Sequence, residues 1–412
     1  MENKLQKAQQ LLKKYGQEEL LENSYIKNKD ELLDEILDLN FEQLKTLYEK
    51  SMKNEQVKKV NIEPIDYIDK EKLTKEEKAK YEKIGEAIIK NGQYAVVTLA
   101  GGQGTRLGHD GPKGTFDFGL KSHKSIFEVL SDTLKQAYEK YNVYVQWYIM
   151  TSEQNNLQII EFFEKNNYFN YPKEKIYFFK QGEFPVLNTN GKLLLNKDGK
   201  INKAADGHGG IFASMKKSGV IQDMKQKEIN WVFIGPVDNV LIKMVDPIFV
   251  GICEGKGVLA GGKSLVKKCP EEKVGVFCKK EGKPSVVEYT EISKEMAEER
   301  NSNGELKYGE SHINCNIFKA SEIEKISEEQ LPYHSAFKKI EYLNKDGKIV
   351  KPKEPNAYKF ETFIFDAFEK LNDMVILRVK REEEFAPIKN AEGVDSPETA
   401  RELYEKYWSI KN

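Results

Sequence analysis

The sequence has few cysteines and no excess of charge of either sign. Its four cysteines, at positions 253, 269, 278 and 315, form no Cys-x-x-Cys pair and have no matching histidine cluster. This pattern disfavours a zinc site and a disulfide framework and suggests a reducing compartment. The 65 basic and 66 acidic side chains leave a formal net charge of -1, which disfavours nucleic-acid binding through a general positive field. We therefore expect an anionic ligand to be bound in a local pocket.

Long apolar runs are also missing. No stretch approaches the ~18 apolar residues that a membrane helix needs, and the N-terminal Met-Glu-Asn-Lys-Leu-Gln-Lys lacks the apolar region of a secretory signal. Internal repeats and low-complexity segments are not evident. We expect a cytoplasmic protein without a membrane segment. The 412 residues, 39% of them hydrophobic and 32% charged, suffice for a packed core and for two or three domains.

A glycine-rich stretch follows the apolar, β-branched run Val96–Leu99. The run predicts a buried strand, and the glycines after it can adopt positive φ and bring backbone N–H groups close to an anion. Arg106 adds a fixed fork of donors and Lys113 a mobile positive charge. The stretch predicts a cradle for a polyphosphate, with a simple strand-to-helix turn as the alternative.

Two familiar phosphate loops do not match this stretch. A P-loop needs Gly-Lys followed by Ser or Thr, whereas Gly104 is followed by Thr105 and Arg106. A dinucleotide-binding fingerprint starting at Gly102 needs glycine or alanine where Leu107 stands. A P-loop ATPase and a dehydrogenase are therefore disfavoured.

The chain divides into a helical N-terminal part and an alternating α/β part. Leu32, Ile36 and Leu39 follow a helical repeat, which predicts an amphipathic helical arm over residues 1–90 that packs on the main domain or on a partner. After residue 94, strands and helices alternate, which is typical of a largely parallel sheet with helices on both faces and ligands at the carboxyl ends of the strands. We predict strands at 145–150, 176–181, 231–237 and 258–261, helices at 125–141, 154–166 and 210–217, antiparallel additions beside a cleft at 274–278, 285–292 and 313–319, a helix at 361–371 and a strand at 375–379. The expected domains are 1–90, a catalytic domain at 91–390 and a short helical tail at 391–412.

Two further segments carry candidate chemistry. The apolar run Trp231–Val237 ends at Asp238, and a carboxylate there suits Mg²⁺, which takes most of its other ligands from phosphates and water. The alternative is an Asp that caps a loop or a helix. Gly207-His208-Gly209-Gly210 precedes an apolar helix, so backbone N–H groups and the His208 ring could face a ligand, although a loop turn explains this segment equally well.

Several motifs resemble those of a known family. Leu-Ala-Gly-Gly-Gln-Gly-Thr-Arg-Leu-Gly, ending at Gly108, and Pro-Lys-Gly at 112–114 resemble the nucleotide loop of the UDP-N-acetylhexosamine pyrophosphorylases, which are UTP-dependent sugar-1-phosphate uridylyltransferases. Later motifs follow in the family's order up to about residue 401. The resemblance implies a Rossmann-like, GT-A-like nucleotidyltransferase fold: a mixed α/β sheet with helices on both faces and an N-terminal helical arm. It also implies that the extra carboxyl-terminal domain of eukaryotic relatives is missing.

The resemblance assigns roles to individual residues. The nucleotide would contact Leu99, Gly101, Gly102, Gly104, Gln181 and Gly207; the departing pyrophosphate would contact Arg106 and Lys113; Asp238 would hold Mg²⁺; and Lys389, within the family-like segment 381–390, would bind the phosphate of the sugar 1-phosphate. The sugar would contact His208, Gly275, Glu288, His312, Phe363 and Phe365. Without the resemblance, Glu288 reads as part of a charged surface strand, the two phenylalanines as core residues, and Lys389 as a solvated lysine.

Two of these positions depart from the family pattern. His208 replaces the Asn of the family's Gly-Asn-Gly-Gly, and His312 replaces the Asn of Ala-Gly-Asn-Ile-Ala. Glucose-1-phosphate uridylyltransferases tend to carry His at the first of these positions. The overall likeness implies N-acetylglucosamine 1-phosphate as the substrate, whereas the two histidines suggest glucose or galactose 1-phosphate; for His312 a role without ligand contact is an equal alternative.

The chemistry that these residues suit is nucleotidyl transfer from UTP. A sugar 1-phosphate has a second pKa near ~6 and needs no general base to attack the α-phosphorus, so the enzyme supplies position and charge. The motif loops contain no evident Ser-His-Asp or Cys-His arrangement, which fits a reaction without a covalent enzyme intermediate. The rival hypothesis is a non-catalytic nucleotide-sugar sensor, which the presence of Lys113 and Asp238 disfavours. We expect the protein to bind UTP and a sugar 1-phosphate and not to bind nucleic acid. The sequence does not fix the oligomeric state, for which a monomer is favoured.

Overall fold

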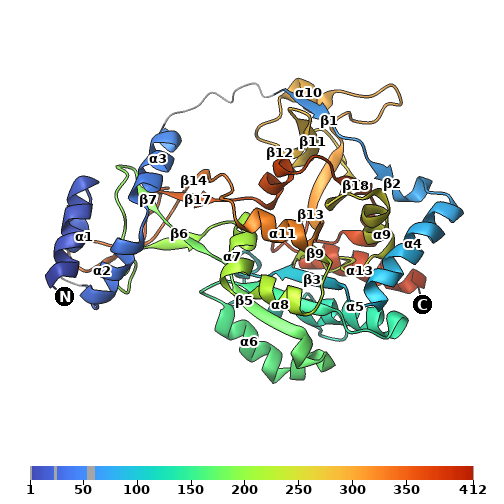
Figure 1. The fold of residues 1–412 in the computed structure, drawn as a ribbon, viewed down its shortest axis with the longest axis horizontal. Coiled ribbons are helices and arrows are strands. Elements are labelled where there is room, and N and C mark those ends of the chain that lie inside the picture. Colours follow the sequence, from blue (N-terminus) through green and yellow to red (C-terminus); the bar gives the residue numbers. More distant parts are fainter. Residues whose placement is uncertain (1, 23–25, 53–60, 412) are drawn as a thin grey trace. The chain divides into compact units, whose positions relative to one another are not determined.

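The computed structural model describes residues 2–22, 26–52 and 61–411, which divide into two compact units. Unit 1 consists of Met1–Lys59, Gly182–Gly210 and Leu331–Phe363, and unit 2 of Val60–Gln181, Ile211–Gln330 and Ile364–Asn412 (Figure 1). Each unit is therefore assembled from segments far apart in the sequence. Each also contains its own cluster of buried apolar side chains.

Unit 2 contains an 11-stranded mixed sheet. Its main path runs β2-β18-β10-β13-β9-β3-β4-β5, and β1, β11 and β12 are attached through β11, which pairs with β13. The pairs β9/β3, β3/β4 and β4/β5 are parallel, whereas β13 is antiparallel to both β9 and β10. The strands are β1 Ile62–Pro64, β2 Ile68–Asp69, β3 Tyr94–Leu99, β4 Gln146–Thr151, β5 Ile176–Lys180, β9 Trp231–Pro236, β10 Ala260–Val266, β11 Val276–Lys280, β12 Lys283–Val287, β13 Glu310–Lys319 and β18 Val375–Arg378.

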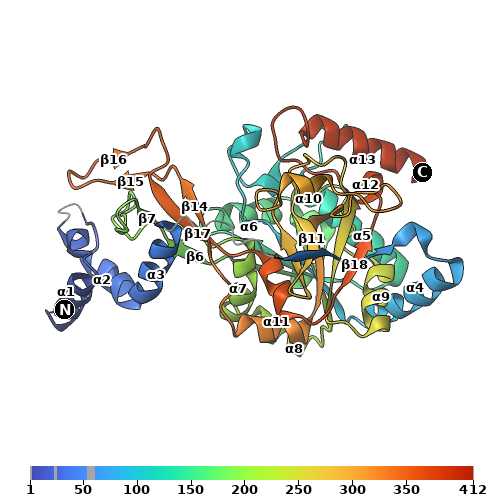
Figure 2. The same cartoon turned by 90° about the horizontal axis from the view of Figure 1, so that it is seen from above.

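Helices cover both faces of this sheet. Side chains of the central strands alternate between the two faces of the sheet. Trp147 and Phe233 face the main buried cluster. Tyr148, the next residue along β4, faces the other side, where its hydroxyl donates to Asp223 of α8 at 2.7 Å. In Figure 2, α13 lies on one side of the strands and α8 and α11 on the other, and α6 buries Phe163 in the main cluster. The helices are α4 Lys75–Lys90, α5 Ile126–Tyr141, α6 Asn156–Lys165, α7 Ile211–Lys217, α8 Val220–Gln226, α9 Pro247–Lys256, α10 Lys294–Glu298, α11 Ala320–Ser327, α12 Arg381–Glu384 and α13 Pro397–Lys411.

Two glycines allow α4 and α9 to pack backbone against backbone. A Cβ on Gly85 would lie 1.9 Å from the carbonyl oxygen of Pro247, and a Cβ on Gly251 would lie 1.8 Å from that of Tyr81. Any larger side chain at either position would push the helices apart, because the obstructing atoms are backbone. The start of α9 is fixed by Asp246, whose carboxylate accepts from the N–H groups of Ile248 and Phe249.

Unit 1 combines N-terminal helices with small antiparallel sheets. Leu32, Leu33 and Ile36 of α2 are buried together with Leu193 and Phe360 from the two later segments. The N-terminal helices thus pack on chain that follows them by well over a hundred residues. The elements are α1 Glu2–Lys14, α2 Lys29–Asp38, α3 Phe41–Met52, β6 Glu183–Pro185, β7 Leu187–Asn188, β8 Lys203–Ala205, β14 His334–Lys338, β15 Tyr342–Leu343, β16 Ile349–Val350 and β17 Ala357–Glu361, paired as β14-β17-β7, β15-β16 and β6-β8.

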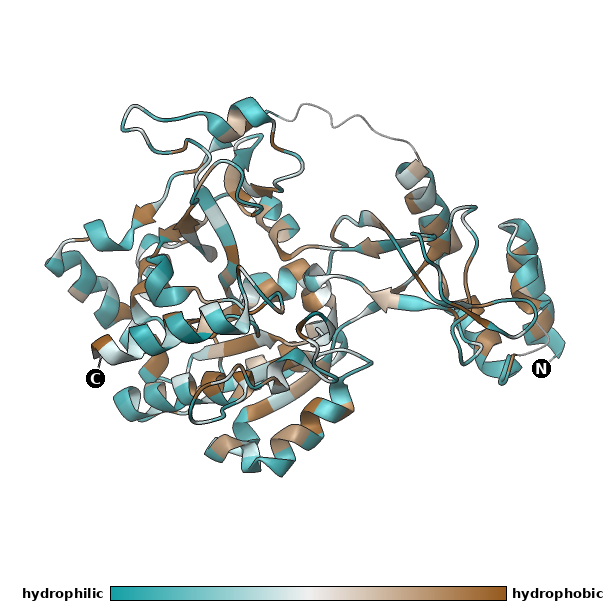
Figure 3. Ribbon diagram, turned by 180° about the vertical axis from the view of Figure 1, so that it is seen from behind, coloured by the Kyte–Doolittle hydropathy of each residue, from teal (hydrophilic) through white to brown (hydrophobic). Residues whose placement is uncertain are grey.

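Short 3₁₀ helices mark the turns. The predicted helix at 361–371 is wrong in part, because β17 continues to Glu361 and the segment Ile364–Lys370 is a 3₁₀ helix, η8. The other 3₁₀ helices are η1 Glu18–Leu21, η2 Lys70–Lys72, η3 Thr105–Leu107, η4 Lys113–Thr115, η5 Asn167–Asn170, η6 Lys173–Lys175 and η7 His208–Gly210. Figure 3 shows that the helices carry hydrophilic and hydrophobic residues along the same element, as amphipathic helices do.

The predicted fold class is confirmed: the protein is a mixed α/β structure with N-terminal helices and helices on both faces of a large sheet. The antiparallel additions expected after residue 270 are β11, β12 and β13, but β12 ends at Val287, so the prediction of a strand over 285–292 is wrong for residues 288–292. Within the described ranges, no helix combines the length and the apolar character that crossing a membrane requires.

Candidate active site

The glycine loop leaves β3 at its carboxyl end and folds back on itself. The N–H of Gly104 donates to the carbonyl of Gly111 at 2.8 Å, and that of Lys113 donates to Gly102 at 3.1 Å. Gly104 has an ordinary φ of -83°, while Gly108 has the left-handed φ of 69°. The expectation of positive φ is therefore met at Gly108, not at Gly104. At Gly104 the reason for glycine is steric, because a Cβ on this residue would lie 2.8 Å from the His109 side chain.

Gln181 lies beside this loop. It follows β5 directly, and its N–H donates to the carbonyl of Thr151 at 2.8 Å. A Cβ on Gly101 would lie 2.7 Å from Gln181 Oε1. The parallel pairing of β3, β4 and β5 explains this contact, since it brings the carboxyl ends of the three strands to one edge. Two of the predicted nucleotide-binding residues are thus in contact range.

Asn155, which the sequence did not predict as a site residue, holds the start of the glycine loop by hydrogen bonds. It is fully buried, and its Nδ2 donates to the carbonyls of Ala100 at 3.0 Å and Gly102 at 3.4 Å. Its Oδ1 accepts from the N–H of Ser152 at 2.8 Å. One amide therefore ties the end of β4 to the start of the glycine loop. No local motif around Asn155 signals this role, because the bonds depend on strand pairing.

Asp238 and Lys113 meet at the end of β9. The N–H of Val237 donates to the carbonyl of Leu99 at 3.1 Å, which sets the chain after β9 beside the chain after β3. Lys113 Nζ lies 3.2 Å from Asp238 Oδ2, and the two side chains are 17% and 18% exposed. The pair brings together a candidate metal ligand and a candidate phosphate ligand. Arg106, in η3 of the same loop, is exposed.

Lys389 lies on a segment attached to the Asp238 loop. The N–H of Ile388 donates to the carbonyl of Asp238 at 2.8 Å, so Lys389 follows the attachment point directly. The Lys389 side chain is 46% exposed, and its Nζ lies 3.9 Å from Asp395 Oδ2. Its backbone N–H donates to the carbonyl of Asp395 at 2.7 Å. The amine is therefore accessible while the backbone that carries it is fixed on both sides.

Four of the predicted sugar-binding residues come together in unit 2: Gly275 just before β11, Glu288 just after β12, His312 in β13 and Phe365 in η8. The N–H of His312 donates to the carbonyl of Gly275 at 2.8 Å, and a Cβ on Gly275 would lie 3.2 Å from Glu288 Oε1. The His312 ring packs edge-on against Phe365 with centroids 6.0 Å apart, and its Nε2 lies 3.2 Å from Asn316 Oδ1. A carboxylate, an imidazole and an aromatic ring thus share one region of unit 2.

The remaining predicted residues, Gly207, His208 and Phe363, lie in unit 1. Gly207 has a φ of 85°, and a Cβ there would lie 2.2 Å from the carbonyl oxygen of Thr362, so only glycine fits. The N–H of Gly209 donates to the same carbonyl at 2.9 Å. The rings of His208 and Phe363 lie 5.4 Å apart between centroids. The segment at 207–210 and the chain that follows β17 are therefore side by side. His208 and Phe363, both predicted to contact the sugar, are neighbours there.

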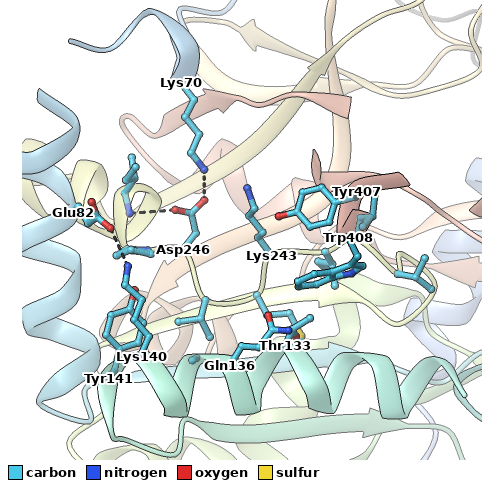
Figure 4. A pocket seen from close by; sticks show the side chains of 18 residues that line it. Lys70, Glu82, Thr133, Gln136, Lys140, Tyr141, Lys243, Asp246, Tyr407 and Trp408 are labelled. Atoms are coloured by element: carbon cyan, nitrogen blue, oxygen red, sulfur yellow. Dashed lines mark hydrogen bonds and ion pairs between the residues drawn. The ribbon is translucent and has the colours of Figure 1, made fainter. Parts of the chain in front are cut away.

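A cavity of about 410 Å³ in unit 2 lies outside the predicted site. It is lined by residues of η2, α4, α5 and α13 and by the stretch at 240–248, which follows Asp238 and includes the start of α9. Figure 4 shows Asp246 at one end with Lys70 directed toward it, and Lys140 paired with Glu82. These distances are 2.8 Å and 3.0 Å.

Asp246 belongs to a buried cluster of charges that also contains Glu384. Lys263, which is 1% exposed, lies 2.9 Å from Asp246 Oδ2 and 2.5 Å from Glu384 Oε2, and Lys70 lies 3.1 Å from Glu384 Oε1. Burial acts to raise the pKa of Glu384, but Lys263, Lys70 and Lys243 outweigh it and lower that pKa to about 2. Burial likewise acts to lower the pKa of Lys70, and the attraction of Asp246 and Glu384 raises it above its ordinary value. Glu384 and Lys70 are therefore both charged near neutral pH.

The fold and this site define a nucleotidyltransferase: a Rossmann-like sheet with a glycine-rich loop after one strand and an acid paired to a lysine after the next. Comparison with known proteins gives the particular family. The model of the UTP–glucose-1-phosphate uridylyltransferase family matches residues 40–395. The chain belongs to this family, as the resemblance of its motifs predicted, and is a nucleotidyltransferase of the uridylyltransferase type.

Individual relatives agree with this assignment. The UDP-N-acetylglucosamine pyrophosphorylase of Saccharomyces cerevisiae is 39% identical over 79% of this chain and 71% of its own. The UDP-N-acetylglucosamine diphosphorylase 2 of Arabidopsis thaliana is 36% identical over 95% of this chain and 82% of its own. The crystal structure of the Trypanosoma brucei UDP-N-acetylglucosamine pyrophosphorylase superposes with a TM-score of 0.81 at 30% identity, covering 96% of this chain and 83% of that one.

A UDP-glucose pyrophosphorylase from Leishmania major shares the fold. Its mutant crystal structure gives a TM-score of 0.65 at 17% identity, over 84% of this chain and 72% of that one. At this level of identity the similarity concerns the fold alone.

Proposed function

We propose that the protein makes UDP-N-acetylglucosamine and pyrophosphate from UTP and N-acetylglucosamine 1-phosphate. The observation that carries this proposal is the Lys113–Asp238 pair, 3.2 Å apart at the edge of the sheet where the glycine loop leaves β3. It supports the proposal because a carboxylate and a cation lie beside the loop whose backbone N–H groups we assign to the triphosphate. The choice of sugar rests on the relatives from yeast and Arabidopsis, whose names specify this product.

In the proposed reaction the enzyme holds two anions in line. A phosphate oxygen of the sugar 1-phosphate attacks the α-phosphorus of UTP, a new P–O bond forms, and the bond from the α-phosphorus to the bridging oxygen breaks, so pyrophosphate leaves with both electrons. The nucleophile is already an anion near neutral pH, and no base is needed. We assign Arg106 and Lys113 to the departing pyrophosphate and Lys389 to the incoming phosphate. Their work is positioning and charge stabilisation.

The remaining assignments follow the family motifs. Leu99, Gly101, Gly102, Gly104, Gln181 and Gly207 are proposed to bind the nucleotide, and His208, Gly275, Glu288, His312, Phe363 and Phe365 to contact the sugar. The contact of Gly101 with Gln181, and that of Gly275 with Glu288, support the grouping of each pair. The cytoplasmic location and the monomeric state stay predictions.

Asp238 fits a role as holder of Mg²⁺. Among the described residues, no three His, Cys, Asp or Glu side chains gather into a metal-binding group. A single carboxylate nevertheless suits Mg²⁺, which accepts one or two carboxylates and completes its octahedron with phosphate oxygens and water. Bound there, Mg²⁺ would neutralise phosphate charge. Lys113 would then be free to exchange its carboxylate partner for a phosphate oxygen.

The test is pyrophosphate release by the purified chain with UTP and Mg²⁺. N-acetylglucosamine, N-acetylgalactosamine, glucose and galactose 1-phosphates are offered in parallel. We expect strong preference for N-acetylglucosamine 1-phosphate, because a polar pocket built around an acetamido group discriminates more strongly than apolar fit. Preference for glucose or galactose would instead assign His208 and His312 to a rebuilt sugar pocket. No release with any of the four would revive the sensor hypothesis and overturn the proposal.

A further inference from the structure

Asn239 makes three side-chain hydrogen bonds, two of them to the segment at 384–386. It is fully buried, and its Nδ2 donates to the carbonyl of Glu384 at 2.7 Å. Its Oδ1 accepts from the N–H of Ala386 at 2.8 Å and from that of Leu241 at 3.2 Å. A neutral amide carries its donor and its acceptor on two separate atoms, whereas a carboxylate only accepts and a hydroxyl carries both on one oxygen. One side chain therefore binds both the Asp238 loop and the segment that leads to Lys389.

Backbone hydrogen bonds continue this attachment on both sides of Asn239. The N–H of Val240 donates to the carbonyl of Ala386 at 3.1 Å, and the N–H of Ile388 donates to the carbonyl of Asp238 at 2.8 Å. Asn239 and Pro387 form a short antiparallel bridge. The attachment therefore ends at Asp238 on one strand of the bridge and one residue before Lys389 on the other.

The far end of the segment is fixed by charge. The Glu384 carboxylate is 2% exposed and contacts Lys263 and Lys70, both of which also contact Asp246 at the end of the Asp238 loop. The two segments are thus joined twice, by ions at Glu384 and by hydrogen bonds at Asn239. Removing the Asn239 amide would leave the ionic end in place and loosen the end nearest Lys389.

We propose that Asn239 is a positioning residue that sets the separation between the Asp238 carboxylate and the Lys389 amine. This inference rests on the proposed roles of those two residues. If Asp238 holds the metal on UTP and Lys389 holds the sugar 1-phosphate, their separation fixes the distance over which the phosphate oxygen attacks. A misplacement of about 1 Å in such an arrangement costs on the order of 10²-fold in rate.

The experiment compares Asn239→Ala with the wild type by steady-state pyrophosphate release. We expect kcat/KM for the sugar 1-phosphate to fall about 10²-fold, with KM for UTP changed little because Asn155 braces the glycine loop independently. In the reciprocal variant, Asn155→Ala, the KM for UTP should rise more than that for the sugar 1-phosphate. Asn356→Ala is the matched control, since Asn356 brackets Ile340 with the same two kinds of bond at 2.7 and 3.0 Å, and it should leave both constants unchanged.

Hydrogen exchange of peptides covering residues 384–390 separates this inference from the proposed function. In Asn239→Ala these amides should exchange faster, and in Asn356→Ala they should not. Unchanged exchange, or equal rises of KM for both substrates, would overturn the role of Asn239. If the wild type turns over no sugar phosphate, the proposed function fails. If the wild type is active and Asn239→Ala is equally active, this inference alone fails. Should Asn239→Ala fail to fold, Asn239→Asp, which keeps the acceptor and loses the donor, is measured in the same way.

Discussion

At the scale of single residues, the site depends on charged groups held by buried amides. The motifs predicted the charged groups: Lys113 and Asp238 are in contact, and Lys389 follows the residue bonded to Asp238. They did not predict Asn155 or Asn239. The role of these two asparagines depends on their burial and on their hydrogen-bond partners. Both arise only when β3, β4 and β9 are paired, so no local pattern in the sequence predicts them.

Removing either partner of the Lys113–Asp238 pair should abolish most activity without unfolding the protein. We expect Lys113→Ala and Asp238→Ala each to lower kcat by about 10²–10³-fold, the cost of deleting one electrostatic contact to the reacting phosphates. Because both side chains are partly exposed, thermal unfolding should change little. The measurements are pyrophosphate release and circular dichroism.

The exposed Lys121 provides a matched control for this pair. Lys121→Ala should retain the wild-type kcat. Near-normal turnover in Lys113→Ala or Asp238→Ala would remove that residue from the proposed machinery.

At the scale of elements, the strands that are buried on both faces were the ones best predicted from the sequence. The runs near 146–151 and 231–236 are largely apolar, and the structure places both inside the sheet, each with a strand on either side. The helix expected at 361–371 fails, because the apolar and aromatic residues there pack in a strand end and a 3₁₀ turn. The two- and three-residue strands of unit 1 carry too few residues for any periodic pattern.

The short helix α12 should make the protein sensitive to acid through Glu384. The folded pKa of Glu384 is about 2, below the ordinary 4.5 of a glutamate. Its carboxylate therefore stabilises the fold fully above pH 4.5, and this contribution is lost as pH falls from 4.5 toward 2. We expect Glu384→Gln to weaken the dependence of the unfolding temperature on pH in this range.

The same variant should also be less stable near neutral pH. It leaves Lys263 buried with one partner fewer, at a cost of about 3–5 kcal/mol in the free energy of unfolding. Its neighbour Glu383, whose side chain is 41% exposed, pairs with Lys243 and Lys380 at the surface, so Glu383→Gln should cost at most about 1 kcal/mol. Equal effects of the two variants in thermal unfolding would contradict this account.

At the scale of the whole molecule, the interleaving of the two units carried no signal in the sequence. The N-terminal helices were recognisable from their repeat, but not the chain they pack on: Leu193 and Phe360 come from segments that look like ordinary loops and short strands. Such partners are set by long-range burial. The predicted division at residues 90 and 390 stays a prediction.

The three tryptophans, Trp147, Trp231 and Trp408, all lie in unit 2. Ile36 is fully buried in the core of unit 1. We therefore expect Ile36→Ala, at a cost of about 2–5 kcal/mol, to add an earlier transition in far-ultraviolet circular dichroism while the tryptophan fluorescence transition stays in place.

The control for this prediction is Ile349→Ala, in the same unit with its side chain 41% exposed. It should leave both transitions where they are in the wild type. A tryptophan transition that moves together with the circular dichroism in Ile36→Ala would contradict separate cores.

The interleaved order of unit 1 also has a consequence during synthesis. Its helices leave the ribosome first, but the last strand that covers them, β17, ends at Glu361. At about 5–20 residues per second, the roughly 300 intervening residues take on the order of 15–60 s to appear. For that time the apolar face of α2 has only part of its native cover, from α1, α3 and the segment at 182–210. We therefore expect chaperones that bind apolar helices to bind the nascent chain in this interval, and slow codons before residue 361 would lengthen the exposure.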